Sequence, residues 1–324
     1  MRCFITGIGG FAGAHLAEHL LAAGHDVGGS ITGRPDRPAL QALRARHDGR
    51  LTLAEADVTD RATLERALAA FVPEAVFHLA GLAYVPRAGA DVARTFAVNT
   101  LGTINVLDAA QQIAPESKIL VVGSAEAYGA ITPADLPIRE ETPLRPASVY
   151  GLSKAAADLA AYQRYWSADL AVIRVRPFNH TGPGQSPDFV CSDFARQIAR
   201  IEAGKAPPIL RVGNLGVVRD FSDVRDVVRG YALLCARGAP GEVYNLCSGT
   251  GTSIARIIEL LTAASATAIE VVEERGRVRH REVPSVVGSA DRAAALGWRA
   301  ELALEETLRA LLADWRQRVA SERH

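Results

Sequence analysis

The chain has 324 residues, which is long enough to bury the core of one large domain or of two smaller ones. Its 36 basic and 36 acidic residues balance, so charge indicates neither nucleic acid nor a membrane surface as a partner. The four cysteines have neither metal-ligand spacing nor the density of a disulfide scaffold, so we expect reduced thiols and no metal. No signal-peptide pattern opens the chain and no apolar run reaches the roughly 20 residues that span a bilayer, which predicts a cytoplasmic protein.

Short apolar runs alternate with helical patterns through the first half, as in β-α-β units with a parallel sheet. Strands are predicted at Cys3–Thr6, from His25–Gly28 onward, and at Ala75–Leu79, Ile119–Val122 and Leu170–Arg174. Helices are predicted at Ala12–Ala23, Asn99–Gln111 and Ser153–Tyr165. From about Asn179, glycine, proline and arginine clusters separate shorter elements. We therefore predict an α/β fold: a Rossmann-type doubly wound parallel sheet over residues 1–178 and a smaller α/β unit over 179–324, with some segments returning to the first.

A glycine-rich segment, Thr6–Gly13, follows the first predicted strand and opens the first predicted helix. Glycines three residues apart permit a tight turn, close approach of a pyrophosphate to main-chain N–H groups, and close helix–sheet packing. Glycines alone also fit a purely structural turn, but this position at a strand–helix junction favours a dinucleotide site. The residues expected to bind the cofactor here are Gly7, Gly10, Phe11 and Gly13.

The end of the second predicted strand indicates which dinucleotide binds. An acidic residue is expected there when the adenosine ribose has a free 2′-hydroxyl, and the segment 27–34 contains none. Ser30, Thr32 and Arg34 could instead accommodate a 2′-phosphate, which favours NADP(H), although NAD(H) stays open. Arg34 could equally be a solvated loop residue.

Asp57 and Val58 lie where the third strand of such a sheet should end. Asp57 could contact the adenine amine, and Val58 would lie beside it in the cofactor cleft. The alternative role of Asp57 is to cap the helix predicted around Thr59–Ala70.

The chain has only three lysines, Lys118, Lys154 and Lys205, and Lys154 follows Tyr150 by four residues. That spacing lets both side chains share one face of a helix, where an ammonium would lower the tyrosine pKa and make the phenol a usable acid or base. Ser124 lies in the segment Gly123–Gly129, which directly follows the predicted strand Ile119–Val122, at the end of the sheet that faces the ligand crevice. We expect the three side chains to meet, although Ser124 could also be a simple turn residue.

The glycine pattern, Ser124 and the Tyr150–Lys154 pair resemble the extended short-chain dehydrogenase/reductase family, whose members mostly modify nucleotide-linked sugars. The second half is similar to the GDP-mannose branch of this family, and its last part especially to the GDP-6-deoxy-4-ketohexose reductases. The resemblance runs over nearly the whole chain. The segments that carry it are Arg176–Gln185, Val212–Phe221, Asp223–Val227, Val243–Gly249, Gly288-Ser289 and Leu308–Val319.

The resemblance implies the roles of the catalytic and cofactor residues. Tyr150 would be the acid/base, Lys154 would hold the nicotinamide ribose and lower the tyrosine pKa, and Ser124 would hydrogen-bond the reacting oxygen. Glu126 would be a further site residue without an assigned role. Other residues expected along the cofactor cleft are Leu79, Ala80, Gly81, Asn99 and Pro177, although Asn99 could equally cap a helix or serve in packing.

The second half would bind the nucleotide sugar. A diphosphate needs fixed donors and arginines, and the resemblance places Asn179, Arg219 and Arg279 on it, Glu282 on the nucleoside ribose and Asn214 near the base. The segment 219–221 could also be a structural ion pair beside a core aromatic residue. The full set expected to contact substrate is Ser124, Glu126, Asn179, Val190, Asn214, Arg219, Arg279 and Glu282.

Several functions share this scaffold. The resemblance favours an NADPH-dependent reductase that converts the C4 ketone of a GDP-4-keto-6-deoxyhexose to a GDP-6-deoxyhexose such as GDP-rhamnose. A GDP-mannose 4,6-dehydratase would need a further acid/base, for which Glu126 is the candidate. Dehydratases of this branch generally have a polar residue between the hydroxyl residue and the glutamate, whereas this chain has Ala125. A nucleotide-sugar 4-epimerase would normally favour NAD and an acid after the second strand. A non-catalytic NADP-binding regulator would usually lack Tyr150 or Lys154.

The resemblance also implies a homodimer, because members of the family commonly pair through a four-helix bundle. Its helices would be the one after Asn99 and the one after Tyr150. The alanine-rich stretch Ala155–Ala161 suits such close packing, although packing within one chain explains it almost as well.

Overall fold

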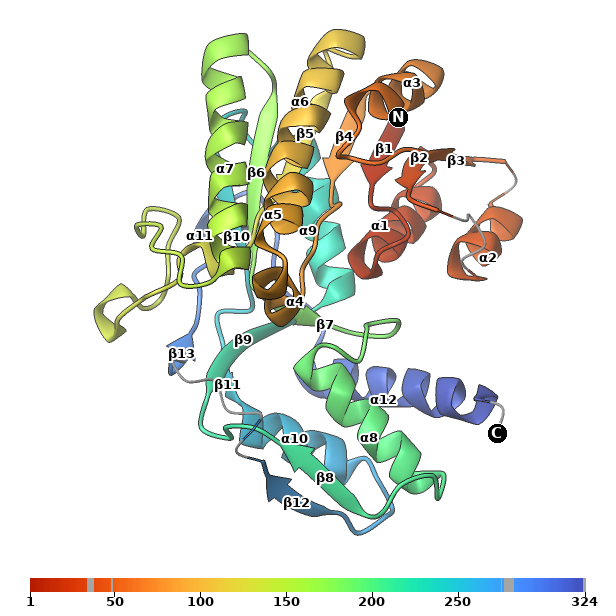
Figure 1. Ribbon diagram of the computed structural model, residues 1–324, viewed down its shortest axis with the longest axis vertical. Coiled ribbons are helices and arrows are strands. Elements are labelled where there is room, and N and C mark those ends of the chain that lie inside the picture. The colour runs from red at the N-terminus through yellow and green to blue at the C-terminus, as the bar shows by residue number, and fades with distance from the viewer. Residues whose placement is uncertain (34–37, 48, 275, 277–282, 323–324) are drawn as a thin grey trace.

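The computed structural model describes residues 1–33, 38–47, 49–274, 276 and 283–322, and it consists of a larger and a smaller unit (Figure 1). The larger unit is built on a seven-stranded sheet in the order β10-β6-β5-β4-β1-β2-β3, and every neighbouring pair is parallel. Its strands are β1 Arg2–Thr6, β2 Asp26–Ile31, β3 Leu51–Glu55, β4 Ala75–His78, β5 Lys118–Val122, β6 Val172–Pro177 and β10 Val243–Leu246. The predicted doubly wound parallel sheet is confirmed.

Both faces of this sheet are buried because strand side chains alternate between two apolar clusters. Cys3 and Ile5 of β1 join the helices α1 and α9 in one cluster, while Phe4 joins α3 and α6 in the other. The helices of this unit are α1 Phe11–Ala22, α2 Pro38–Arg46, α3 Arg61–Phe71, α4 Val85–Ala90, α5 Val92–Phe96, α6 Gly102–Ile113, α7 Val149–Ala168, α9 Val224–Arg237 and α11 Asp291–Ala295. Short turns of helix lie at Ala97–Leu101, Ala125–Ala127 and Pro133–Asp135.

Two predicted boundaries move because of local hydrogen bonding. The helix predicted at Ser153–Tyr165 begins at Val149, since the Ser148 hydroxyl caps it by accepting from the Gly151 N–H at 3.0 Å. The helix predicted from Asn99 begins as a π-helical turn before α6. Such turns are often found at functional sites.

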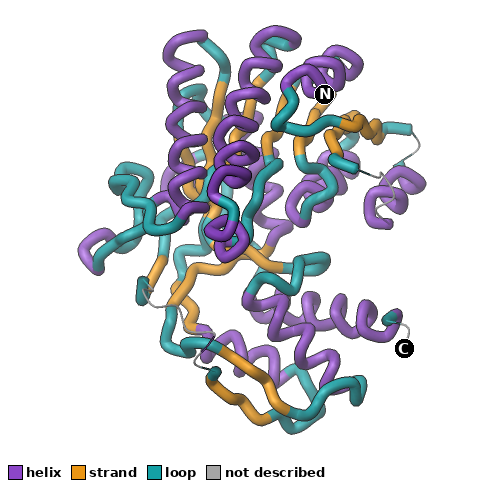
Figure 2. The backbone as a smooth tube through the Cα atoms, in the orientation of Figure 1, coloured by secondary structure: helices purple, strands orange, loops and turns teal. Residues whose placement is uncertain are grey.

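The smaller unit has its own apolar core between helices and two small sheets (Figure 2). One sheet joins β7, β9, β11 and β13, and the other pairs β8 with β12. The elements are β7 Asn179–Thr181, α8 Val190–Glu202, β8 Ile209–Val212, β9 Val218–Asp223, β11 Gly251–Ser253, α10 Ile254–Ala263, β12 Glu270–Glu273, β13 Ser285–Val286 and α12 Leu304–Ser321. The chain returns to the larger unit with α9 and β10.

Two carboxylates of the segment 223–227 hold the units together. Asp223 caps α9 by accepting from the Arg225 N–H at 2.7 Å, and it also accepts from the Thr307 hydroxyl of α12 at 2.8 Å. Asp226 accepts from the N–H groups of residues 301 and 302, both at 2.8 Å. These bonds attach the C-terminal segment to the first helix that returns to the large sheet.

All three lysines donate to main-chain carbonyl oxygens. Lys118 reaches the Ala236 carbonyl at 2.8 Å at the end of α9, and Lys205 reaches the Val319 carbonyl at 2.7 Å at the end of α12. A cation at a helix C-terminus satisfies free carbonyls and favours the helix dipole. Two of the rare lysines therefore serve the fold, and Lys154 alone lies in the predicted site.

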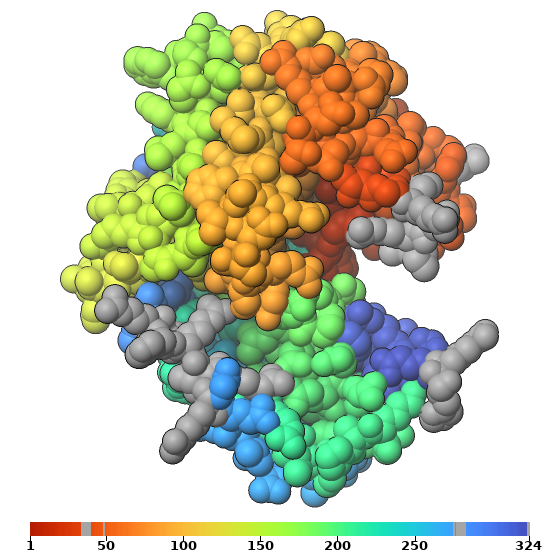
Figure 3. Space-filling view, viewed as in Figure 1, coloured from red at the N-terminus to blue at the C-terminus, as the bar shows by residue number. Residues whose placement is uncertain are grey.

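The space-filling view is hollowed between the larger unit and the helices α8 and α12 of the smaller one (Figure 3). In Figure 1 the carboxyl ends of the large sheet's strands point toward this side. Among the described residues, no helix is both long and apolar enough to cross a membrane.

Candidate active site

The glycine-rich segment forms a tight turn between β1 and α1. Gly7 has φ +72, and a Cβ there would lie 2.8 Å from the main-chain nitrogen of Ala80. A Cβ on Gly13 would overlap the carbonyl oxygen of Gly7. Side chains are therefore excluded at both positions, because the turn packs directly against the loop after β4.

The first turn of α1 begins at a residue that cannot cap it with a side chain. Its N-cap residue is Gly10, whose conformation is extended and which supplies no side-chain cap. By contrast, α3 and α7 are capped by Asp60 and Ser148. Uncapped N–H groups at a helix N-terminus suit a phosphate, so the turn fits a dinucleotide pyrophosphate.

The predicted cofactor loop after β4 is held by a chain of buried hydrogen bonds. The Thr103 hydroxyl donates its proton to the Asn99 carbonyl at 2.6 Å. Because a hydroxyl has only one proton, the Thr103 oxygen must accept from His78 Nε2, which lies 2.9 Å away. Thr6 then donates to His78 Nδ1 at 2.7 Å and accepts from the Ala80 N–H at 3.3 Å. Burial, with the nearby Lys154 charge, lowers the pKa of His78 to about 3, so the ring stays neutral and keeps this arrangement.

The Asn99 side chain is fully buried and joins this loop to α7. Its Oδ1 accepts from the Leu82 N–H at 2.8 Å, and its Nδ2 donates to the Ser153 hydroxyl at 3.0 Å. Asn99 thus has the packing role that the sequence left open. A Cβ on Gly81 would lie 3.5 Å from Lys154 Nζ, so the structure brings this loop and Lys154 together.

Ser124 and Tyr150 meet at the carboxyl end of β5. Ser124 caps the short helical turn 125–127 by accepting from the Glu126 N–H at 3.1 Å. Burial raises the pKa of Tyr150 to about 12, a hydrogen bond with Ser124 opposes this rise, and the charge of Glu126 adds to it. The Ser124 hydroxyl, the phenol and the exposed Glu126 therefore lie within one site.

The prediction that Lys154 lowers the pKa of Tyr150 is wrong for this structure. The phenol is buried, and desolvation disfavours the phenolate more than its neighbours stabilise it. Lys154 Nζ donates to the Val122 carbonyl at 2.7 Å. Burial also lowers the pKa of Lys154 to about 8, because an ammonium loses hydration there.

Four of the predicted substrate residues, Asn179, Val190, Asn214 and Arg219, lie on the smaller unit. Asn179 is exposed, and the parallel pairing of β7 with β9 places it beside Phe221. Phe221 lies two residues after Arg219 on β9. Arg219 is half-buried and donates to the Val283 carbonyl at 2.9 Å. Val190 begins α8, and exposed Asn214 accepts from the Gly216 N–H at 3.0 Å. Arg279 and Glu282 lie outside the described residues.

Asp220 organises the loops beside Arg219. Its carboxylate accepts from the Ser248 N–H at 2.8 Å, the Gly249 N–H at 2.9 Å and the Gly288 N–H at 3.3 Å. Burial raises the pKa of Asp220, and these hydrogen bonds oppose the rise. Asp220 therefore joins the segments at 248–249 and at 288 to β9 next to Arg219.

A family model described as GDP-mannose 4,6 dehydratase matches residues 4–311. The chain belongs to this family. It is 39% identical over 322 residues to the GDP-6-deoxy-D-mannose reductase of Pseudomonas aeruginosa, with 99% of each chain covered. It is 30% identical over 328 residues to the GDP-mannose 4,6-dehydratase sdnI of Sordaria araneosa, covering 93% of this chain and 58% of that one.

A solved structure, that of RMD from Pseudomonas aeruginosa complexed with NADPH, is similar throughout. The TM-score is 0.84 at 37% identity, and 98% of this chain and 99% of that chain are covered. The resemblance to the extended short-chain dehydrogenase/reductases is thereby confirmed, and the chain belongs to an oxidoreductase enzyme family.

The structure shows where most of the residues predicted to contact the adenosine end of the cofactor lie, and which residue caps the helix after Asp57. Ser30 is buried at the end of β2, Thr32 is exposed beyond it, and Arg34 lies outside the described residues. Asp57 does not cap the following helix, because Asp60 does so by accepting from the Ala62 N–H at 3.1 Å. The exposed Asp57 accepts from the N–H and the hydroxyl of Thr59, each at 2.8 Å.

Two further residues predicted to contact the cofactor, Val58 and Pro177, are buried. Val58 packs beneath α6, where a Cβ on Gly102 would lie 2.7 Å from its methyl group. Pro177 ends β6. Both stay predictions as cofactor contacts, since the geometry here shows only their packing.

The sequence did not reveal a buried ion cluster between α7 and β6. Asp158 lies one turn beyond Lys154 and accepts from Arg174 Nη1 at 2.8 Å and from Arg176 Nε and Nη2, both at 2.9 Å. Arg176 also donates to the Tyr128 hydroxyl at 3.1 Å. The sequence did contain a signal for this cluster. Asp158 lies on the apolar face of the predicted helix, and Arg174 and Arg176 lie on a strand that is buried on both faces.

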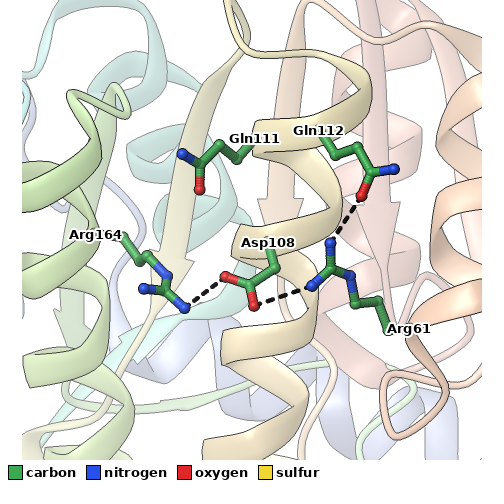
Figure 4. A pocket seen from close by; sticks show the side chains of 5 residues that line it. All are labelled: Arg61, Asp108, Gln111, Gln112 and Arg164. Atoms are coloured by element: carbon green, nitrogen blue, oxygen red, sulfur yellow. Dashed lines mark hydrogen bonds and ion pairs between the residues drawn. The ribbon is translucent and has the colours of Figure 1, made fainter.

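A surface hollow between α3, α6 and α7 is separate from this site (Figure 4). Asp108 bridges two arginines in it, at 2.7 Å from Arg164 and 3.4 Å from Arg61. No predicted site residue lines it; the lining residues are Arg61, Asp108, Gln111, Gln112 and Arg164.

Replacing Lys154 with methionine is expected to stabilise the fold at pH 7 by about 1 to 2 kcal/mol. The methionine side chain has no charge to desolvate, so the cost of burying an ammonium disappears from the free energy of folding. The Val122 carbonyl loses its hydrogen-bond donor, and this loss offsets part of the gain in stability. The pKa of Lys154 is about 8 in the folded chain against its ordinary value of 10.5, so between these two pH values the unfolded chain binds more protons than the folded one. Wild-type stability therefore rises with pH there, and the advantage of the variant shrinks.

Urea unfolding of both proteins at pH 7 and pH 10 measures this difference. Lys118→Met is the matched lysine control and is expected to destabilise, because it removes the cap on α9. A Lys154→Met protein that is less stable than wild type at pH 7 would contradict the expectation.

Proposed function

We propose that the protein reduces the C4 ketone of a GDP-4-keto-6-deoxyhexose with NADPH, giving a GDP-6-deoxyhexose of the GDP-rhamnose type. The observation that carries this proposal is the joint placement of Ser124, Tyr150 and Lys154 beside the glycine-rich turn. The likeness to the Pseudomonas aeruginosa reductase over 99% of each chain supports the substrate class. The Pseudomonas aeruginosa RMD structure with NADPH supports the cofactor, although NAD(H) remains an alternative.

NADPH, when bound, supplies the hydride that adds to C4. The Ser124 hydroxyl would bind the ketone oxygen, and the Tyr150 phenol would donate its proton to that oxygen as negative charge develops there. Lys154, near Gly81, would hold the ribose, and solvent would return a proton to the Tyr150 phenolate. One hydride and one proton thus convert the ketone to an alcohol.

The raised pKa of Tyr150 favours the reductive direction. A phenol of pKa about 12 stays protonated at neutral pH, which suits a proton donor. Dehydratases and epimerases of this scaffold begin by removing a proton from a C4 hydroxyl, for which a phenolate is needed. The protonated phenol therefore suits the first step of a reduction, and the choice among the three activities rests on the assay below.

A GDP-mannose 4,6-dehydratase is the second candidate. Glu126 is exposed within the site, and its charge acts on Tyr150, so an additional acid/base is present. The description of the family model and the Sordaria araneosa relative also point to this activity.

Incubation with GDP-mannose and, separately, with its 4-keto-6-deoxy derivative distinguishes the candidates. We expect NADPH absorbance to fall only with the keto sugar and a GDP-6-deoxyhexose to form. Formation of keto sugar from GDP-mannose without net loss of NADPH would replace the reductase with the dehydratase. Repeating the assay with NADH tests the preference for the 2′-phosphate.

A homodimer is proposed from an exposed apolar stripe on α7. Leu152, Leu159 and Trp166 follow one another at seven-residue spacing and are 48%, 57% and 76% exposed. Residues at this spacing lie along one side of a helix, as in helical bundles. Of the alanines in the stretch Ala155–Ala161, Ala155, Ala157 and Ala161 are buried within the chain, whereas Ala156 and Ala160 are partly exposed beside the stripe.

Leu159→Asp is expected to convert the dimer to a monomer in light scattering at micromolar concentration, because it places a charge in the apolar stripe. Val271→Asp, at an exposed apolar site of the smaller unit, is the control and should leave the dimer intact. A dimer that persists in Leu159→Asp would contradict this interface.

A cytoplasmic location is also proposed, supported by four buried free cysteines.

A further inference from the structure

Helix α1, which carries the predicted pyrophosphate site, contacts the smaller unit through two side chains on successive turns. The Phe11 ring stacks on His180, with centroids 6.1 Å apart and planes 8° from parallel. One turn later, His15 Nε2 lies 2.9 Å from the Pro183 carbonyl. A carbonyl only accepts, so His15 carries its proton on Nε2 and donates it. His15 also packs edge-on against Phe11 at 5.5 Å.

His180 is fixed within its own segment. Its Nδ1 lies 3.0 Å from the Phe178 carbonyl and must therefore donate to it. Burial lowers the pKa of His180, so the ring is neutral at physiological pH. The stacking partner of Phe11 is thus an uncharged ring whose orientation is set by β7.

The segment 179–185 belongs firmly to the smaller unit. Gln185 closes it by accepting from the Thr181 hydroxyl at 2.6 Å and donating to the His180 carbonyl at 2.9 Å. The Gly184 N–H donates to Asp314 of α12 at 3.0 Å. Because β7 also pairs with β9, this segment moves with the strand that carries Arg219.

The two predicted ligand sites are therefore separated by one stacked pair of rings. Phe11 is the first residue of α1, at the uncapped N-terminus that fits a pyrophosphate. His180 directly follows Asn179, the predicted ligand of the substrate diphosphate.

We propose that His180 is a positioning residue that couples cofactor binding at α1 to nucleotide binding at Asn179. This inference depends on the proposed function for the identity of the two ligands. A dinucleotide on the first turn of α1 restrains Phe11, and through the stacked ring it fixes β7, which carries Asn179, against α1 before the second ligand binds. That ligand loses less conformational entropy on binding, so each ligand strengthens the other, and by the same factor.

Calorimetric titrations of the full chain test this coupling, with NADPH and GDP as the two probes. The dissociation constant of each is measured alone and with the other at saturation. In wild type we expect each ligand to tighten the other about 5-fold or more, by equal factors. In His180→Ala we expect that factor to fall to within about twofold of one, while each ligand binds alone within about threefold of wild type.

Two further variants separate coupling from loss of folding. His180→Phe keeps a ring against Phe11 and is expected to restore most of the coupling factor, which a merely structural defect would not do. His19→Ala removes another histidine of α1 and should leave the coupling unchanged. His15→Ala loses only the bond to Pro183 and should weaken the coupling partly.

The outcomes distinguish this inference from the proposed function. Wild type that binds both ligands without coupling, or His180→Ala that keeps the wild-type factor, overturns the inference alone. Wild type that fails to bind NADPH or GDP overturns the proposed function and the inference with it.

Discussion

Replacing Tyr150 with phenylalanine is expected to lower kcat by a factor of about 10² to 10⁴. The variant keeps the buried ring and loses only the hydroxyl that would donate the proton to the C4 oxygen. The affinity for NADPH should change little, because the pyrophosphate site at α1 and the loop after β4 do not depend on that hydroxyl. Steady-state kinetics with the keto sugar and a separate NADPH titration measure the two effects.

Tyr165→Phe is the matched control, since it removes a phenol hydroxyl from the same helix at a partly buried position of the core. It is expected to keep wild-type turnover. Unchanged turnover in Tyr150→Phe would reject the catalytic assignment. Absence of turnover in wild type, together with tight NADPH binding, would favour a non-catalytic NADP-binding regulator.

Replacing Asp158 with asparagine is expected to lower the free energy of unfolding by about 3 to 5 kcal/mol. Asp158 is 1% exposed and is the carboxylate that pairs with both Arg174 and Arg176. An amide of the same shape keeps the volume but leaves two buried guanidinium groups without their counter-charge. Urea unfolding followed by circular dichroism measures the loss.

Glu202→Gln is the matched control, because Glu202 also pairs in bidentate fashion with an arginine, Arg316, at 2.7 Å for both contacts. That pair lies at the surface, where Arg316 is 43% exposed, so we expect a change of at most about 1 kcal/mol. A similar small change in Asp158→Asn would mean that the buried cluster contributes little to the attachment of α7 to β6.

Local patterns allowed the fold and most of the catalytic group to be predicted. The alternation of apolar runs with helical patterns indicates the parallel sheet, because each strand is buried on both faces. Gly7 and Gly13 are required by close main-chain approach at one turn, and Tyr150 and Lys154 share a helix face by spacing alone. These inferences need only short-range geometry, so they hold without knowledge of the distant parts of the chain.

Contacts between distant segments could not be predicted in the same way. The Asp158–Arg176 pair joins a helix to the following strand, and the stack of Phe11 on His180 joins residues 169 positions apart in the chain (180 minus 11). An arginine or a histidine in the sequence has many possible partners, and a partner is chosen only when the elements pack. The resemblance to the family supplied expected roles for substrate residues, but it did not indicate these contacts.

The sequence by itself determined the fold class, the dinucleotide turn and the pairing of a tyrosine with a rare lysine. The tertiary structure alone decided the electrostatics of that pair. Burial raises the pKa of Tyr150 to about 12 and lowers that of Lys154 to about 8, the opposite of the predicted shift for the phenol. The physical reason is that spacing along a helix sets which groups are neighbours, whereas desolvation depends on everything packed around them.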